Sequence, residues 1–116
     1  MNIKSVRWGV IGLGSFGVLT VLILHWMVFF WVPTESFQGV IQRIFYIHVP
    51  SAWTALISVV IVAIGSLIYL LTSNEKWDSL AYSAGEIGMI LASLTLLSGI
   101  IWAKPIWGVW WTWDAR

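Results

Sequence analysis

Three long runs of apolar residues, separated by short polar segments, dominate the pattern of this chain. The runs cover residues 9–32, 51–71 and 82–102. Each is long enough to cross a bilayer, which takes about 20 apolar residues. Because hydrocarbon offers no partners for open backbone groups, each run must be helical. The pattern therefore predicts an all-α polytopic membrane protein with three transmembrane helices, which form a single membrane domain over residues 1–116.

The connections between these spans are short. Residues 33–50 form the first connecting loop, residues 72–81 form the second, and residues 103–116 follow the third span. With an odd number of spans, the first loop and the C-terminal segment face the same compartment. These two segments are the aromatic-rich parts of the chain, so the topology predicts that they come together at one membrane surface.

The amino-acid composition excludes most classes of soluble protein. The chain is 59% hydrophobic and 9% charged, whereas a soluble domain carries about 25% charged residues. Six Lys and Arg against five Asp and Glu leave no basic stripe for nucleic acid. The absence of cysteine excludes a disulfide, a thiolate nucleophile and covalent haem attachment through C-x-x-C-H. No acid–base pair is visible either, so we do not expect an enzyme.

The basic residues do not orient the protein. Three fall on each side of the predicted membrane: Lys4, Arg7 and Lys76 on one, and Arg43, Lys104 and Arg116 on the other. The positive-inside rule is therefore balanced. Lys4 and Arg7 lie directly before the first span, which favours an inside N-terminus.

Three glycines in the first span match the spacing of a nucleotide-binding motif. Gly12, Gly14 and Gly17 spell G-x-G-x-x-G, and Glu35 follows about 20 residues later. The segment after Gly17 is apolar on every face, which suits lipid or deep burial and not a soluble βαβ unit. We therefore interpret these glycines as sites of close helix packing. The same interpretation applies to a small-residue stripe in the third span: Ala84, Gly88 and Ala92.

The first loop leads to a histidine. Residues 37–48 are amphipathic at helical spacing, which predicts a surface helix lying along the membrane. Pro50 suits the first turn of the second span and disfavours a helical Val49, so His48 is predicted at a hinge between two helices. A neutral imidazole there is a nitrogen donor for iron. The alternative is an interfacial histidine hydrogen-bonded to water or to a carbonyl.

Tryptophan crowds the C-terminal segment. Pro105 is predicted to end the third helix, and four of the chain's ten tryptophans follow it: Trp107, Trp110, Trp111 and Trp113. If the segment is helical, Trp107, Trp110, Trp111 and Asp114 share one face. Clustered indoles make a flat apolar platform with N–H donors at its edges, which suits a planar amphiphile such as a porphyrin. The alternative is an interfacial anchor.

Two stretches of the chain resemble a known family. Residues 43–53 read RIFYIHVPSAW, and residues 104–116 read KPIWGVWWTWDAR. Both are similar to CcmC, the haem exporter protein C of cytochrome c maturation. The C-terminal stretch also resembles the WWD signature W-G-x-W-W-x-W-D of its superfamily. Relatives such as CcmF and CcsA usually place proline after the aspartate, so Asp114-Ala-Arg116 is more like CcmC.

The resemblance implies a function. Family members have about six spans in the inner (cytoplasmic) membrane, a cytoplasmic N-terminus and a WWD segment at the outer surface. His48 matches the first of two axial ligands of a transiently bound b-type haem. The resemblance implies haem export to the chaperone CcmE beside the ABC transporter of CcmA and CcmB. The haem platform would comprise Trp107, Gly108, Trp110, Trp111, Trp113 and Asp114.

Several expectations accompany this resemblance. The match covers about half of a family member, so we expect the chain to be the N-terminal half and to lack the second axial histidine. We also expect weak or absent haem binding unless a second polypeptide completes the site. A different function is a b-type electron-transfer subunit in which His25 and His48 ligate haem; otherwise His25 is expected to be a packing residue. Ser83 and Glu86 read as a capping box at the start of the third span, and a buried functional Glu86 is the alternative.

Overall fold

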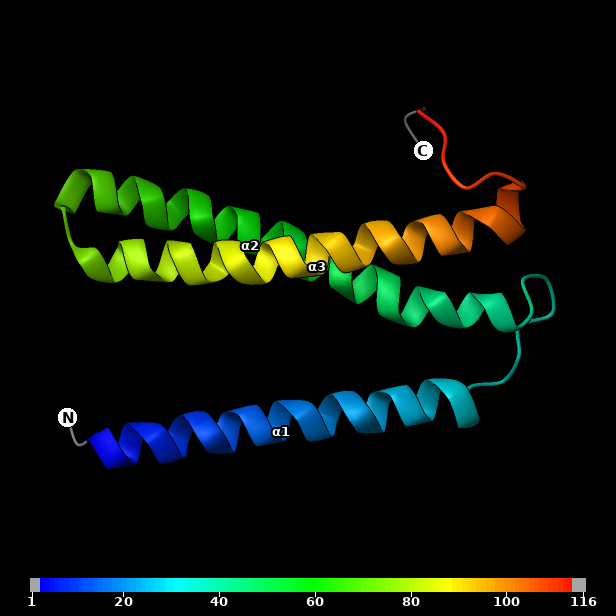
Figure 1. Ribbon diagram of the computed structural model, residues 1–116, viewed down its shortest axis with the longest axis horizontal. Coiled ribbons are helices and arrows are strands. Elements are labelled where there is room, and N and C mark those ends of the chain that lie inside the picture. The colour runs from blue at the N-terminus through cyan, green and yellow to red at the C-terminus, as the bar shows by residue number, and fades with distance from the viewer. Residues whose placement is uncertain (1–2, 114–116) are drawn as a thin grey trace. The chain divides into compact units, whose positions relative to one another are not determined.

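A computed structural model describes residues 3–113 of the chain (Figure 1). It contains the helices α1 (Ile3–Phe30), α2 (Phe45–Thr72) and α3 (Glu75–Trp107), with a short 3₁₀ helix η1 (Val40–Ile44) before α2. All three long helices are long and apolar enough to cross a membrane. The predicted all-α architecture with three candidate membrane spans is therefore confirmed. Residues 1–34 and residues 35–116 form two separate units.

Helix α1 forms the first unit. At about 1.5 Å per residue its 28 residues extend about 42 Å, more than the roughly 30 Å of a hydrocarbon core. Gly12, Gly14 and Gly17 all lie inside this helix. A dinucleotide site needs a strand followed by a glycine turn, so the helical backbone rules out the nucleotide-binding interpretation. His25, near the C-terminal end, lies with its Nδ1 2.8 Å from the Val21 carbonyl oxygen one turn earlier.

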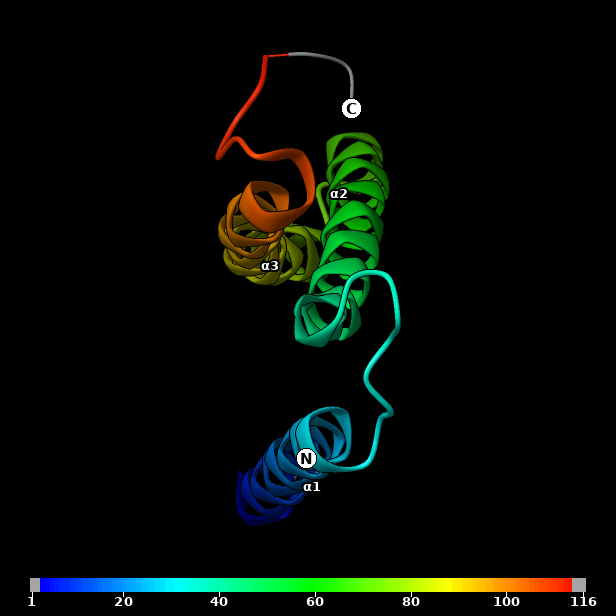
Figure 2. The ribbon, with the colours of Figure 1, turned by 90° about the vertical axis from the view of Figure 1, so that its right-hand side faces the viewer.

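The second unit is an antiparallel pair of helices, in which α2 and α3 lie side by side in both views (Figures 1 and 2). A tight turn reverses the chain between them. Ser73 takes the left-handed conformation (φ 53°), and its N–H donates to the Tyr69 carbonyl at 2.7 Å. The Asn74 side chain then caps α3 by accepting from the Lys76 N–H at 3.1 Å.

This turn corrects the predicted capping box. Since α3 begins at Glu75, Ser83 and Glu86 lie well inside the helix, and the Ser83 hydroxyl donates to the Ser79 carbonyl at 2.9 Å. Asn74 performs the capping that we predicted for Ser83. The apolar run begins seven residues after α3 does, because the first turns of this helix are polar. The start of an apolar run indicates where a helix enters the membrane and does not indicate where the helix begins.

Small residues bring α2 and α3 together. The buried positions are Ser51, Ser58 and Gly65 on α2, and Ala81, Ala84 and Gly88 on α3. A methyl group added to Gly88 would lie 2.9 Å from the Ser58 Cβ, and one added to Gly65 would lie 3.2 Å from the Ala81 Cβ. The two backbones thus approach closely, as small residues allow at helix contacts in membranes.

The predicted small-residue stripe is therefore right at Ala84 and Gly88 and wrong at Ala92, which is exposed. The reason is geometric. Steps of four residues drift by about 40° each around a helix of 3.6 residues per turn. A contact line between two long helices instead follows a repeat of seven residues, and Ala81 and Gly88 are seven apart.

The same register sets the neighbours at the other end of the pair. Ten residues before Ser58 on α2 lies His48, and ten residues after Gly88 on α3 lies Ser98. Because the helices are antiparallel, these two residues meet, and the His48 Nδ1 lies 3.0 Å from the Ser98 Oγ. The packing of the small residues thus positions a pair that is 50 residues apart in sequence.

Two prolines do not end helices as predicted. Helix α2 runs without a break through Pro50, so His48 lies inside α2 and not at a hinge. Helix α3 likewise continues through Pro105 to Trp107. Each proline removes one backbone hydrogen bond close to a helix end, where few bonds depend on it. The amphipathic pattern before His48 also proves wrong as one surface α-helix, because residues 40–44 form η1.

Candidate functional site

The segment after α3 turns back along the helix that precedes it, as Figure 1 shows. Gly108 ends α3 in the left-handed conformation (φ 77°), and its N–H donates to the Lys104 carbonyl at 2.9 Å. The Lys104 ammonium in turn donates to the Gly108 carbonyl at 2.9 Å. Glycine suits this position because it has no Cβ to oppose a positive φ. Trp110 and Trp111 therefore do not continue the helix, and the predicted shared helical face does not form.

A cavity of about 650 Å³ lies between this returning segment and the helix pair. Its size falls in the range of about 300–1,000 Å³ that is usual for small-molecule and cofactor sites. The lining comes from α2, α3 and the returning segment: His48, Thr95, Leu96, Gly99, Ile100, Trp102, Ala103, Trp107, Val109, Trp110, Trp111 and Thr112. The structure thus brings the two segments singled out from the sequence to one cavity.

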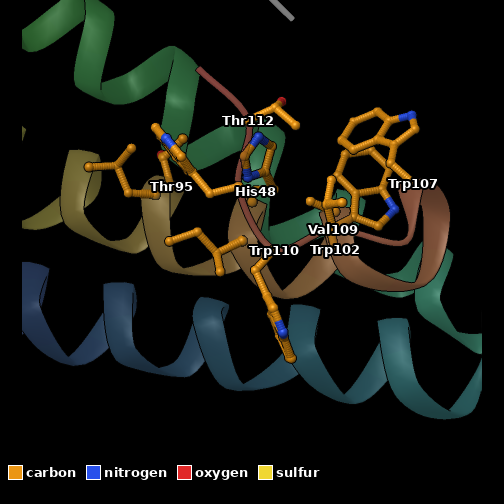
Figure 3. Close-up of a pocket in the computed structure, with 12 residues that line it drawn as sticks. His48, Thr95, Trp102, Trp107, Val109, Trp110 and Thr112 are labelled. Atoms are coloured by element: carbon orange, nitrogen blue, oxygen red, sulfur yellow. The ribbon is translucent and has the colours of Figure 1, made fainter. Parts of the chain in front are cut away.

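His48 projects from α2 into this lining and is held on three sides (Figure 3). Its Nδ1 lies 3.0 Å from the Ser98 Oγ. Its ring meets the Trp102 ring edge to face, with 5.7 Å between centroids and 64° between planes. A methyl group added to Gly99 would lie 3.0 Å from the His48 Cε1, so the ring fits against bare backbone. The imidazole is therefore a positioned group and not a freely rotating interfacial side chain.

The predicted tryptophans divide by their place at the cavity. Trp107, Trp110 and Trp111 line it, and each is about half exposed. In Figure 3 the Trp110 indole extends away from the His48 ring. Trp113 is 95% exposed and forms a T-shaped contact with Trp111, with 5.6 Å between ring centroids. Of the other predicted residues, Gly108 forms the helix cap, and Asp114 lies outside the residues that the structure describes.

Trp102 and Gln38 were not predicted as parts of the site. Trp102 is the last residue of the third apolar run, and its ring packs against both His48 and Phe45. Its indole N–H donates to the Gln38 side-chain oxygen at 3.2 Å, which connects α3 to the loop before η1. Two signals in the sequence could have identified part of this site: the alignment of Ser58 with Gly88 puts Ser98 opposite His48, and the seven-residue repeat from Ala81 and Gly88 reaches Trp102.

Lys104 contacts a tryptophan of the cavity, and Glu35 stabilises the loop before η1. The Lys104 Nζ lies 5.7 Å from the centre of the Trp110 ring, a cation–π contact. In the loop, the Glu35 carboxylate accepts hydrogen bonds from the backbone N–H groups of Gln38 and Phe37, and these lower its pKa. Among residues 3–113, no three His, Asp or Glu side chains gather as a metal site.

The fold and this cavity define a class of protein, an α-helical membrane protein in which one histidine of a helix pair lines a cavity together with four tryptophans. Comparison with known families narrows the class. The chain belongs to the CcmC family, heme exporter protein C, whose family model matches residues 4–116. The resemblance inferred from the two motifs is thereby confirmed.

Individual relatives agree with this family. A ccmC-like mitochondrial protein of cytochrome c biosynthesis from Marchantia polymorpha is 37% identical over 113 residues, which are 97% of this chain and 49% of that protein. Heme exporter protein C of Escherichia coli (strain K12) is 32% identical over 84% of this chain and 40% of its own length. The Rhodobacter capsulatus protein of that name is 35% identical over 76% and 36%. The chain thus spans half or less of the length of these relatives, and no solved structure matches it.

Proposed function

We propose that this chain supplies one wall of a haem-holding site in a haem exporter of cytochrome c maturation. One observation carries the proposal: His48 of α2 lines the same cavity as Trp107, Trp110 and Trp111, although about 60 residues separate them in sequence. An imidazole that shares a cavity with three indoles suits a flat iron macrocycle, because iron takes a nitrogen ligand and the ring takes apolar contacts.

The residues present fit haem as a transient cargo. Without cysteine the chain cannot attach haem covalently, so the site would hold b-type haem through one His48 bond and contacts with indoles. Haem also carries two propionates. Lys104, fixed beside Trp110 and Gly108, is the cation that would meet one of them at the rim of the cavity.

The family suggests where the cargo goes. Relatives bear the name heme exporter protein C, and we infer that this chain works in the inner membrane with its N-terminus in the cytoplasm. The cavity would then face the outer side, where haem would pass to the chaperone CcmE next to CcmA and CcmB. In this role the protein binds and presents haem and carries out no chemical step on it.

A haem titration of the chain in lipid nanodiscs tests the proposal. His48→Ala should weaken haem binding by more than about 100-fold, since loss of a ligand exceeds the roughly 10–100-fold effect of changing a ligand's neighbour. His25→Ala is the matched control and should leave the affinity unchanged, because the His25 imidazole is bonded to its own helix.

The same titration separates the alternative function. If His25→Ala removes haem as completely as His48→Ala, a bis-histidine electron-transfer subunit replaces haem presentation as the explanation. If His48→Ala binds haem as the wild type does, the proposed site is wrong.

A further inference from the structure

Ser98 makes an unusual set of contacts for a serine in an apolar helix. Its hydroxyl lies 2.7 Å from the Leu94 carbonyl and 3.1 Å from the Thr95 carbonyl, both in α3. It also lies 3.0 Å from the Nδ1 of His48 on α2. A hydroxyl has one proton to donate and two lone pairs with which to accept. Since its own helix takes the proton, Ser98 accepts a hydrogen bond from His48.

This assignment fixes the tautomer of His48. A neutral imidazole has one N–H donor and one nitrogen with a free lone pair. If Nδ1 carries the hydrogen and donates it to Ser98, the lone pair resides on Nε2. Among the described residues, no hydrogen bond to the His48 Nε2 is present, so this nitrogen is available to a ligand in the cavity that His48 lines.

Gly99 fixes the position of the same ring. An added methyl group would lie 3.0 Å from the His48 Cε1 and 3.6 Å from Nδ1, so a larger residue would push the imidazole away from Ser98. Trp102 limits the ring from another side through its edge-to-face contact. Two neighbouring turns of α3 thus contribute one acceptor, one bare backbone position and one aromatic wall.

We propose that Ser98 and Gly99 form a seat that sets the tautomer and orientation of His48, so that Nε2 is presented to the iron of incoming haem. This inference rests on the proposed function of His48 as the iron ligand. Ser98 is a positioning residue, since it acts through His48 and does not touch the cargo. Partners of this kind orient a ligating histidine and raise its basicity, and their loss typically costs about 10–100-fold in metal affinity.

The first test reads the tautomer without any haem. The chain has two histidines, so His25→Gln leaves His48 as the single histidine for ¹⁵N labelling in nanodiscs. In this background the ¹⁵N chemical shifts should report one tautomer with the hydrogen on Nδ1. Ser98→Ala should give a mixture or the opposite tautomer, whereas Ser98→Thr, which keeps the hydroxyl, should restore the wild-type signal.

The second test is a haem titration of the same variants. Ser98→Ala should bind haem about tenfold more weakly, and Ser98→Thr should remain close to wild type. A Ser98→Ala protein that keeps the Nδ1–H tautomer and full affinity, while His48→Ala loses haem, overturns the seat and leaves the proposed function standing. If His48→Ala binds haem normally, the proposed function is wrong, and so is the proposal that Ser98 and Gly99 present Nε2 to iron. The tautomer experiment still shows separately whether Ser98 orients the His48 ring.

Discussion

The two ends of the α2–α3 pair use the same contact line for opposite purposes. At the closed end, which is the half of the pair that extends from Ser58 and Gly88 to the turn at Ser73, small residues let the backbones approach until a methyl group added to Gly88 would lie 2.9 Å from the Ser58 Cβ. At the open end, around His48 and Gly99, a glycine again leaves space because it has no side chain, but here the imidazole of the opposite helix fills that space. The register is common to both ends, and only the partner of the glycine differs.

This difference shows how a membrane helix pair can hold a site. The hydrophobic effect that drives helix packing in water is weak between helices in lipid, so van der Waals contact between small residues stabilises the pair. That contact fixes the register at the closed end. The contacts at the closed end also determine which residues of α2 and α3 face each other at the open end. The open end can therefore hold large aromatic and polar groups and a cavity of about 650 Å³, because its own contacts are not needed to align the helices.

Adding one methyl group at each end should produce the largest difference between the two ends, in stability at one and in haem binding at the other. Gly88→Ala places it 2.9 Å from the Ser58 Cβ, which is fixed to the backbone. The free energy of unfolding, measured by circular dichroism in mixed detergent micelles, should fall by about 1–3 kcal/mol. Gly99→Ala meets only the end of the His48 ring, so it should preserve stability while weakening haem binding.

Gly85 supplies the control for that experiment. A methyl group there would lie 3.8 Å from its nearest neighbour, a Val62 methyl carbon. Gly85→Ala should therefore be neutral or slightly stabilising, because alanine favours a helix more than glycine does. Equal stability of the Gly88→Ala and Gly85→Ala proteins would show that close approach at Gly88 does not hold the pair together.

A smaller effect should distinguish two neighbouring tryptophans at the open end. Trp111 lines the cavity and is 49% exposed, whereas Trp113 lies outside the lining at 95% exposure. Trp111→Ala should weaken haem binding by about 10–100-fold, since burying a large apolar side chain is worth about 1.5–3 kcal/mol and 1.4 kcal/mol is tenfold. Trp113→Ala should change the affinity less.

This pair of variants also tests the motif as read from the sequence. The WWD signature assigns both tryptophans to the haem platform, and the cavity separates them. If Trp113→Ala weakens haem binding as much as Trp111→Ala in the same titration, the motif describes the site better than the geometry of the cavity does.

The sequence predicts much of this molecule because the membrane makes long apolar runs unambiguous. The three helices, the pairing of Ala84 and Gly88 with a neighbour, and the family all follow from local patterns. The helix ends do not, because Pro50 and Pro105 were interpreted as helix breaks although one missing hydrogen bond near a helix end has little effect. Capping by Asn74 and Gly108 decides where α3 begins and ends.

The parts of the site that escaped prediction depend on the helix register. His48 and the tryptophans can be identified by residue type and motif. Ser98 and Gly99 are ordinary residues for an apolar helix, and their role appears only when α2 and α3 are aligned through Ser58 and Gly88. An antiparallel alignment of α2 with α3 on Ser58 and Gly88 places Ser98 opposite His48, whereas the seven-residue repeat of small residues does not reach Gly99.

The smallest expected effect concerns the loop behind the open end. Hydrogen bonds from the backbone N–H groups of Gln38 and Phe37 lower the pKa of Glu35 below its ordinary value of 4.5. The stabilisation of this turn by the carboxylate is therefore fully present above the ordinary pKa and is lost as the pH falls through the lowered one. Gln38 also accepts from Trp102, so a loosened turn would loosen the wall beside His48.

Hydrogen exchange of the backbone amides measures this effect. Comparing Glu35→Gln with the wild type at each pH removes the intrinsic pH dependence of exchange. At neutral pH the Gln38 and Phe37 amides should exchange faster in the variant, and the difference should vanish below the lowered pKa. The Lys76 amide, bonded to the uncharged Asn74 side chain at 3.1 Å, is the control and should not respond. Equal exchange of wild type and variant at neutral pH would mean that the carboxylate does not hold the loop, and the open end would then depend on α2 and α3 alone.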